Sequence, residues 1–246
     1  MTAGFARARY RADNYLYLLV DGAEAALVDP GDPAVALAVA AAHGVTPRWI
    51  VHTHGHADHT GGTAELRARL GATVFGHGAD AGWFAPDRDL AGLTEVRLGG
   101  LQLRVHHVPG HTPGSVLLEW RGRLLTGDTL FWGGCGNCRH GGDPALLAAS
   151  LLGVVGRLDG ALTVHPGHDY AEANLPFALE LDPSSGAARS RLQAVRAAKL
   201  AGEEPPPSTL AEERASNPFL RASALAELIA LRARRDEWTP RPSVPE

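Results

Sequence analysis

Histidine and aspartate side chains gather in one short segment of this sequence, in a pattern that can bind metal ions. Residues 53–59 read Thr-His-Gly-His-Ala-Asp-His, so His54, His56, Asp58 and His59 lie within six residues. Zinc, iron and manganese accept imidazole nitrogens and carboxylate oxygens as ligands. The spacing differs from that of His-Glu-x-x-His, in which two histidines share one face of a helix. The segment therefore predicts another kind of metal site, with enough ligands to begin two sites.

Three later segments each offer one more ligand. His111 lies in Pro-Gly-His-Thr-Pro-Gly, Asp128 in Thr-Gly-Asp-Thr, and His168 in His-Pro-Gly-His-Asp-Tyr. Each segment alone is a weak signal, because residues beside glycine and proline often only form turns. All three nevertheless follow predicted strands, as residues 53–59 do. We therefore expect these side chains to converge at one edge of the sheets.

The order of strands and helices indicates how the ligands could meet. Residues 14–20 and 25–28 are typical of a hairpin around Asp21-Gly22, and Asp32-Pro33 is typical of a helix start. That helix should end near residue 43, and a buried strand over 48–52 should lead into the histidines. Further strands are expected at 73–75, 95–98, 101–107, 115–120, 123–126 and 162–165, and helices at 61–70 and 143–157. This mixed order predicts an α/β fold with two sheets flanked by helices rather than one wound sheet.

The last third of the chain has a different pattern. Strand signals vanish beyond Asn174, and helices are expected at 177–181, 187–201, 209–214 and 223–235. We therefore predict a catalytic domain over residues 1–172 and a small helical, substrate-binding domain over residues 173–246.

Composition limits the classes of function. The net charge is −4, which argues against a nucleic-acid partner, and the lone lysine, Lys199, does not lie in the glycine-rich loop that binds phosphates. No apolar stretch approaches the about 20 residues of a membrane span, and no signal peptide is evident, so a cytoplasmic protein without a membrane partner is expected. Cys135 and Cys138 are too few for a four-cysteine zinc site or a disulfide framework.

The order of the seven ligands resembles the metallo-β-lactamase superfamily, whose pattern is His-x-His-x-Asp-His, then a histidine, an aspartate and a histidine. This resemblance implies an αβ/βα sandwich of two mixed sheets with a small C-terminal helical domain. It also implies that His54, His56 and His111 hold one metal ion, that Asp58, His59 and His168 hold a second, and that Asp128 bridges both. Zinc is expected, with iron and manganese as alternatives.

Such a centre suits hydrolysis. Two divalent ions can bridge and activate a hydroxide that attacks an acyl carbonyl, with Asp58 and Asp128 as candidates to orient it. Free thiols have a pKa near ~8.5, so a thiolate leaves with little protonation, and thioester cleavage needs no separate general acid.

A closer resemblance, to the glyoxalase II (hydroxyacylglutathione hydrolase) family, extends over nearly the whole chain. It rests on segments at residues 13–15, 28–31, 127–136, 168–170, 207–213 and 217–221. It implies hydrolysis of a hydroxyacyl (lactoyl-type) thioester of glutathione or a similar small thiol, as in methylglyoxal detoxification. Tyr170 and Arg221 would bind the thiol carrier, with Arg234 or Arg235 as alternatives to Arg221. A monomer or small homo-oligomer is expected.

One segment departs from the family pattern and leaves the thiol open. The family carries a basic residue, aromatic residues and Glu-Gly after Gly-Cys-Gly, whereas this chain reads Asn137-Cys138-Arg139-His140. Arg139 could replace the missing basic contact. Two alternative functions also remain at this point: a persulfide dioxygenase with one iron, and another ester or lactone hydrolase of the superfamily. A non-enzymatic metal-binding module is disfavoured because none of the seven ligands is missing.

Overall fold

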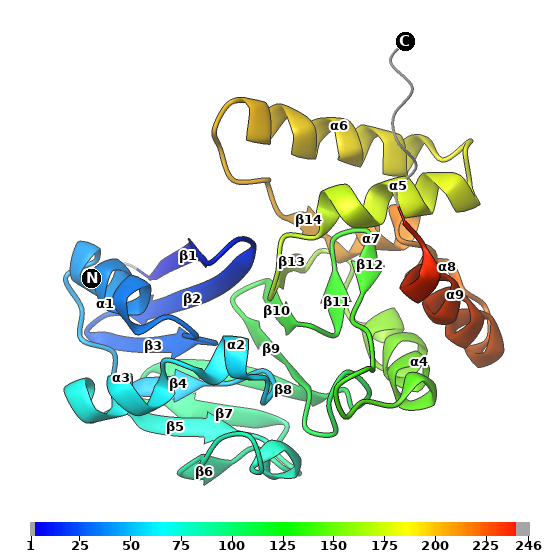
Figure 1. Cartoon of the computed structure of the whole chain (residues 1–246). Helices are drawn as coiled ribbons and strands as arrows, with labels where there is room; N and C mark the ends of the chain where they lie inside the picture. Colours follow the sequence, from blue (N-terminus) through cyan, green and yellow to red (C-terminus); the bar gives the residue numbers. More distant parts are fainter. Residues whose placement is uncertain (1–2, 240–246) are drawn as a thin grey trace.

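Two mixed β-sheets lie at the centre of the protein, with helices on the outer side of each (Figure 1). The computed structural model describes residues 3–239. The first sheet follows sequence order, antiparallel from β1 to β3 and parallel from β3 to β6. Its strands are β1 (Gly4–Tyr10), β2 (Asn14–Asp21), β3 (Glu24–Val28), β4 (Trp49–Val51), β5 (Thr73–Gly76) and β6 (Arg88–Asp89).

The second sheet also has six strands, in the order β14-β13-β10-β9-β8-β7. β13 runs parallel to β10, and the other neighbours are antiparallel. Its strands are β7 (Glu95–Leu98), β8 (Leu101–His107), β9 (Val116–Trp120), β10 (Arg123–Gly127), β13 (Thr163–Pro166) and β14 (Ser208–Thr209). A small hairpin, β11 (Leu130–Phe131) and β12 (Gly134–Cys135), follows β10. The expected sandwich of two mixed sheets is confirmed.

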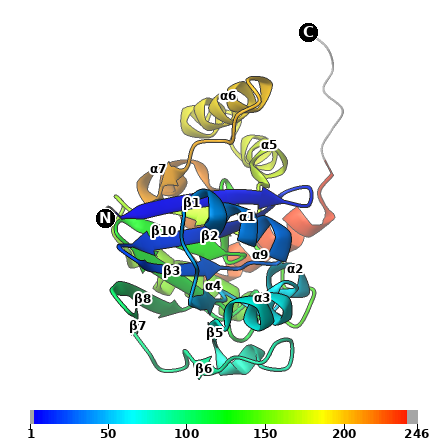
Figure 2. The same ribbon diagram turned by 90° about the vertical axis from the view of Figure 1, so that its left-hand side faces the viewer.

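Strand β2 shows why the first sheet is buried on both faces. Alternate side chains of a strand point to opposite faces, so Tyr15, Tyr17 and Leu19 enter the core shared with the second sheet. The intervening Leu16, Leu18 and Val20 pack with residues of the outer helices α1 (Pro33–Ala42) and α3 (Thr63–Leu70). Both helices cover the outer face of this sheet (Figure 2).

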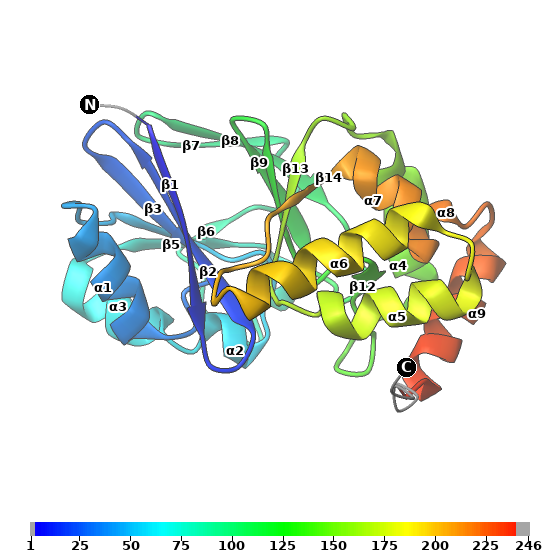
Figure 3. The same cartoon turned by 90° about the horizontal axis from the view of Figure 1, so that it is seen from above.

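The later α-helices form the opposite outer layer, beside the second sheet (Figure 3). They are α4 (Pro144–Gly153), α5 (Ala171–Leu181), α6 (Gly186–Leu200), α7 (Leu210–Ser216), α8 (Pro218–Arg221) and α9 (Leu225–Glu237). Three short helices, α2 (Ala57–Thr60), η1 (Gly78–Asp80) and η2 (Val155–Arg157), complete the described elements. Within the described residues, no helix combines the length and apolar character needed to cross a membrane.

Most predicted elements are confirmed. The hairpin pairs Asp21 with Glu24 across its turn, and the Asp32 side chain caps α1 by accepting a hydrogen bond from the Val35 amide at 3.0 Å. The strands predicted at 95–98 and 101–107 coincide with β7 and β8.

One expectation is wrong in detail, and one strand was not predicted. Strands do not end at Asn174, because Ser208 and Thr209 form β14 and pair antiparallel with β13. The sequence pattern also did not indicate β1, in which Arg7 and Arg9 alternate with apolar residues on a half-buried edge strand. The proposed domain boundary after residue 172 falls inside α5, which begins at Ala171.

The helical C-terminal region is closely tied to the sheets. The buried Glu213 carboxylate accepts a hydrogen bond from the Gly133 amide at 2.8 Å, and the Asn217 side chain donates one to the Gly134 carbonyl at 2.9 Å. Asp169, directly after β13, pairs with Arg9 of β1 at 2.8 Å and with Lys199 of α6 at 2.9 Å. These contacts connect the first strand, the last ligand loop and the helical region.

Candidate metal centre and adjoining pocket

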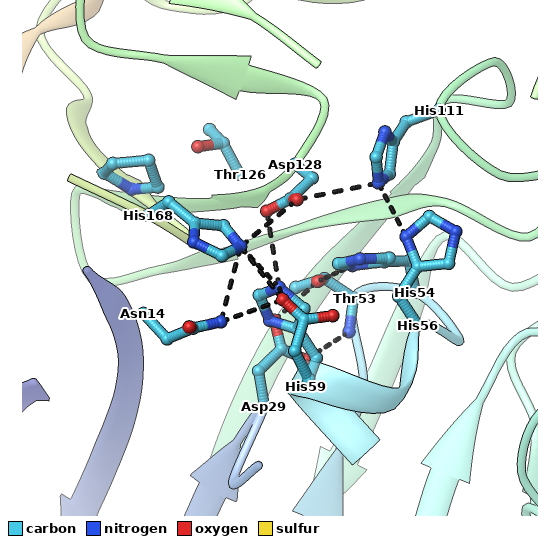
Figure 4. Close-up of polar contacts among 12 residues, drawn as sticks. Asn14, Asp29, Thr53, His54, His56, His59, His111, Thr126, Asp128 and His168 are labelled. Atoms are coloured by element: carbon cyan, nitrogen blue, oxygen red, sulfur yellow. Dashed lines mark hydrogen bonds and ion pairs between the residues drawn. The ribbon is translucent and has the colours of Figure 1, made fainter. Parts of the chain in front are cut away.

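The ends of the strands bring the seven predicted ligands together. Figure 4 shows the histidines of this set and Asp128. β4 leads into the loop of His54 and His56, and α2 then carries Asp58 and His59 in its single turn. The loop between β8 and β9 carries His111. Asp128 follows β10, and His168 follows β13. Because β10 and β13 are parallel neighbours, their last residues reach the same edge of the sheet.

Three histidines form the first group of potential ligands. One ring nitrogen of each of His54, His56 and His111 lies within 4.8 Å of the others. The His56 Nδ1 and His111 Nε2 atoms face each other at 3.0 Å. The His54 Nε2 atom is buried and has no hydrogen-bond partner among the described residues. Unpaired, converging nitrogens of this kind fit a metal ion.

A second group consists of Asp58, His59 and His168, whose ligand atoms also lie within 4.8 Å of one another. The Nε2 atoms of His59 and His168 are 3.1 Å apart, and Asp58 Oδ2 lies 3.2 Å from His168 Nε2. This set of nitrogen and oxygen atoms suits zinc, iron or manganese.

Asp128 lies between the two groups (Figure 4). Its Oδ2 atom is 3.6 Å from His111 Nε2 in the first group and 3.4 Å from His168 Nε2 in the second. Its Oδ1 atom is buried without a hydrogen-bond partner in the described structure and lies 3.5 Å from His59 Nε2. A carboxylate in this position can act as a metal ligand in both groups.

Neighbouring acceptors orient two of the imidazoles. The second nitrogen of His111 lies 2.7 Å from the Asn137 carbonyl, and that of His168 lies 2.8 Å from the Asp13 carboxylate. Such a partner holds the proton on one nitrogen and leaves the other free to bind a metal ion.

Two buried aspartates support the ligand loops, and sequence reasoning gave neither a role. Asp29, held at a φ of 50°, accepts hydrogen bonds from the amide and hydroxyl of Thr53 at 2.8 and 2.6 Å. Asp29 also lies near His54 and His59 in a third potential ligand group, but these two bonds favour a supporting role. Asp80 accepts from the Gly55 amide at 2.8 Å, the Thr112 hydroxyl at 2.7 Å and the Gly114 amide at 2.7 Å, and so joins two ligand loops.

Asn14 is a further contact that sequence reasoning missed. Its side-chain amide donates to Asp58 Oδ2 at 2.9 Å. Asp13, Asn14 and Asp29 lie in segments that carry the family resemblance, whereas no sequence signal marked Asp80.

The electrostatics of the centre favour cations. Burial lowers the pKa of His168, but Asp128, Asp58 and Asp13 outweigh that effect and raise the pKa to about 11. Burial and the neighbouring His59 hold the pKa of His54 well below its usual value, so that its imidazole stays neutral and able to bind a metal ion. The carboxylates therefore create a negative potential that favours a bound cation, and such an ion would displace the second proton of His168.

A pocket of about 230 Å³ lies beside the second group of ligands. Its lining includes two predicted substrate contacts, Tyr170 and Arg139, together with Arg235. Tyr170 stacks on His168 with ring centroids 4.7 Å apart. Arg221 lies elsewhere: it is on α8 and forms an ion pair with Asp182 at 3.0 Å. Arg221 therefore does not line this pocket, and its contact with the thiol carrier stays a prediction, whereas Arg235, the alternative that the sequence also offered, lies in the pocket lining.

Comparison with known proteins identifies the family. A family model of the metallo-beta-lactamase superfamily matches residues 11–171, and a model of the hydroxyacylglutathione hydrolase C-terminus matches residues 169–240. A protein of Anaeromyxobacter dehalogenans named hydroxyacylglutathione hydrolase is 71% identical over 220 residues, which cover 89% of this chain and 86% of the relative. The chain belongs to the hydroxyacylglutathione hydrolase family. The match of the C-terminal model agrees with the helical region seen here.

Solved structures place this hydroxyacylglutathione hydrolase family member among metallo-β-lactamase folds. ETHE1 from Myxococcus xanthus is 28% identical with a TM-score of 0.74, covering 97% of this chain and 92% of that one. TTHA1623, solved in a di-iron-bound form, is 29% identical with a TM-score of 0.63, covering 84% of this chain and 95% of that one. The superfamily and the histidine-aspartate cluster together indicate a centre for divalent metal ions.

Proposed function

We propose that this protein hydrolyses hydroxyacyl (lactoyl-type) thioesters of glutathione and releases the hydroxy acid and the free thiol. The observation that carries this proposal is the identity of 71% to a relative named hydroxyacylglutathione hydrolase, over a length that includes all seven candidate ligands. The pocket of Tyr170, Arg139 and Arg235 beside those ligands supports it. The proposal extends to a cytoplasmic role in methylglyoxal detoxification.

The two ligand groups would each hold one divalent ion. We assign His54, His56 and His111 to the first ion and Asp58, His59 and His168 to the second, with Asp128 shared. Zinc suits this imidazole-rich set, and the di-iron form of the related TTHA1623 supports iron as the alternative. When bound, such ions supply Lewis acidity, which polarises the acyl carbonyl and lowers the pKa of water.

The chain's own residues position the reactants. Asp58 and Asp128 would accept hydrogen bonds from the attacking water and orient it; the half-buried position of Asp58 and the distances from Asp128 to both ligand groups support these roles. The guanidinium groups of Arg139 and Arg235 fit the carboxylates of glutathione, because each presents a planar fork of donors. No dedicated acid is needed for the departing thiolate, since free thiols ionise near pH ~8.5.

A panel of lactoyl thioesters, assayed together with metal analysis, tests the proposal. We expect two metal ions per chain and a higher kcat/KM for the glutathione thioester than for the cysteine and coenzyme A thioesters. Asp128→Asn should remove at least one ion and reduce kcat about 100-fold or more, because one carboxylate serves both ligand groups. The exposed turn residue Asp159 provides the control variant Asp159→Asn, which should change neither quantity. Full activity without stoichiometric metal would refute the proposal.

The persulfide dioxygenase alternative is not favoured. The C-terminal family model and the relative at 71% identity both carry the hydroxyacylglutathione hydrolase name. Oxygen consumption with a glutathione persulfide provides the discriminating assay, and we expect none above background.

A further inference from the structure

A tryptophan lies at the rim of the metal centre. The Trp83 ring is centred 5.6 Å from the ring of His56 in an edge-to-face arrangement, and 46% of this residue is exposed. Single exposed aromatic residues are common on protein surfaces, so exposure alone indicates no role. The position of Trp83 beside a candidate ligand is the informative observation.

The surrounding backbone holds Trp83 in place. The Trp83 amide donates to the Asp80 carbonyl at 3.0 Å, and the Asp80 carboxylate binds the Gly55 amide between two candidate ligands. A Cβ atom at Gly55 would lie 2.8 Å from Trp83 Cε3, and one at Gly141 would lie 3.1 Å from Trp83 Cη2. The ring therefore packs against both loops at positions where only glycine leaves room for it, so its orientation is well defined.

The accessible side of the centre lies next to this ring. Of the seven candidate ligands, His56 and Asp58 are half-buried and the other five are buried. Trp83 lies beside His56 of the first ligand group, whereas Tyr170 stacks on His168 of the second group. Two aromatic rings therefore border the centre, one beside each group.

The proposed function assigns the thiol carrier to one of these two sides. The pocket on the Tyr170 side contains the arginines proposed to bind the thiol carrier. A thioester whose carbonyl lies over the centre then extends its acyl group toward the opposite side. Resting on the proposed function, we infer that Trp83 forms a wall of the acyl subsite and favours hydroxyacyl groups with a planar apolar substituent, such as phenyl, over those with methyl.

The size of the effect follows from aromatic packing. An aromatic pair changes an equilibrium or a rate by about two- to tenfold beyond ordinary burial. Removal of the indole should therefore reduce the preference for phenyl over methyl by about fivefold.

The test compares two glutathione thioesters, one with a phenyl-bearing and one with a methyl-bearing hydroxyacyl group, on the metal-loaded enzyme. We expect Trp83→Ala to reduce the ratio of their kcat/KM values (phenyl over methyl) about fivefold, and Trp83→Phe to restore most of it. Leu93→Ala, at another exposed apolar residue, is the matched control and should leave the ratio unchanged. Because Trp83 is half exposed, its replacement should permit folding, which metal content and thermal unfolding will check.

Each outcome has a defined meaning. An unchanged ratio in Trp83→Ala, or an equal loss with both substrates, would overturn the acyl-subsite inference while leaving thioester hydrolysis intact. Absence of thioester hydrolysis in the unmodified metal-loaded enzyme would instead overturn the proposed function, and the subsite inference with it.

Discussion

The rings of Tyr170 and His168 lie nearly parallel, with planes inclined by 9° and centroids 4.7 Å apart. One ring lines the pocket and the other belongs to the second ligand group. The stack therefore places the Tyr170 ring beside the centre, where its hydroxyl can contact a thiol carrier bound in the pocket.

Tyr170→Phe should retain the stack and lose only the hydroxyl. We expect KM for the glutathione thioester to rise about three- to tenfold with kcat nearly unchanged, because one hydrogen bond to the carrier is removed. Steady-state kinetics provide the measurement, with metal content as a check on the centre. A loss confined to kcat would contradict a carrier-binding role.

Arg235 and Arg221 form a natural pair for mutagenesis. Arg235 lines the pocket, whereas Arg221 pairs with Asp182 outside it. Arg235→Ala should raise KM about tenfold or more, because a charge-assisted contact is lost. Arg221→Ala should change KM less than about twofold, since a surface ion pair contributes little. The reverse order of effects would support the sequence-based assignment of Arg221.

Asp80 should be required for both stability and metal affinity. Its carboxylate is buried and accepts three hydrogen bonds from the loops of the first ligand group. Asp80→Ala should destabilise the protein by about 3 kcal/mol or more in urea unfolding, because three donors lose their partner. It should also weaken metal binding about 10- to 100-fold in a chelator competition. The exposed Asp159, changed to alanine, is the control, and equal effects of the two variants would refute this role.

His165 should contribute to the loss of stability in acid. Burial, reinforced by Arg7 and Arg123, lowers the pKa of His165 to about 3 from an ordinary value near 6.5. Since the folded-state pKa is the lower one, protonation favours the unfolded chain. The contribution of neutral His165 to the free energy of unfolding is fully present above pH ~6.5. It is lost at about 1.4 kcal/mol per pH unit as the pH falls toward 3.

The variant His165→Gln should make the slope of unfolding free energy against pH shallower by up to about 1.4 kcal/mol per pH unit below pH ~6.5. Urea unfolding of the metal-free protein at several pH values provides the measurement. His43→Gln, at an exposed histidine, is the control. An unaltered slope in His165→Gln would show that the histidine already titrates normally in the folded state.

The candidate ligands could be predicted from sequence because their signals are local. Four lie in one segment, and His111, Asp128 and His168 each follow a recognisable strand. The supporting contacts of Asp29 and Asp80 could not be predicted, since they cross 24 and 25 residues of chain to reach Thr53 and Gly55. Such contacts leave no spacing pattern in one sequence.

The two strands that the sequence pattern did not predict have local physical explanations. In β1, the guanidinium groups of Arg7 and Arg9 lie over the buried ring of Tyr15, so a strand contains charged residues where the pattern requires apolar ones. The pair Ser208-Thr209 is too short to show alternation. The choice between Arg221 and Arg235 depends on the directions of α8 and α9, which sequence spacing does not specify.

The pairing of β14 with β13 makes the helical region part of the catalytic scaffold rather than an attachment to it. A chain cut after residue 172 would lose the strand that pairs with Thr163 and Val164. The backbone of β13, the strand that precedes His168, would then present unpaired hydrogen-bonding groups at the edge of the sheet. The metal centre and the pocket lined by Tyr170 are therefore expected to unfold in a single transition. The two-sheet sandwich and the helical region each depend on contacts with the other for their folded structure.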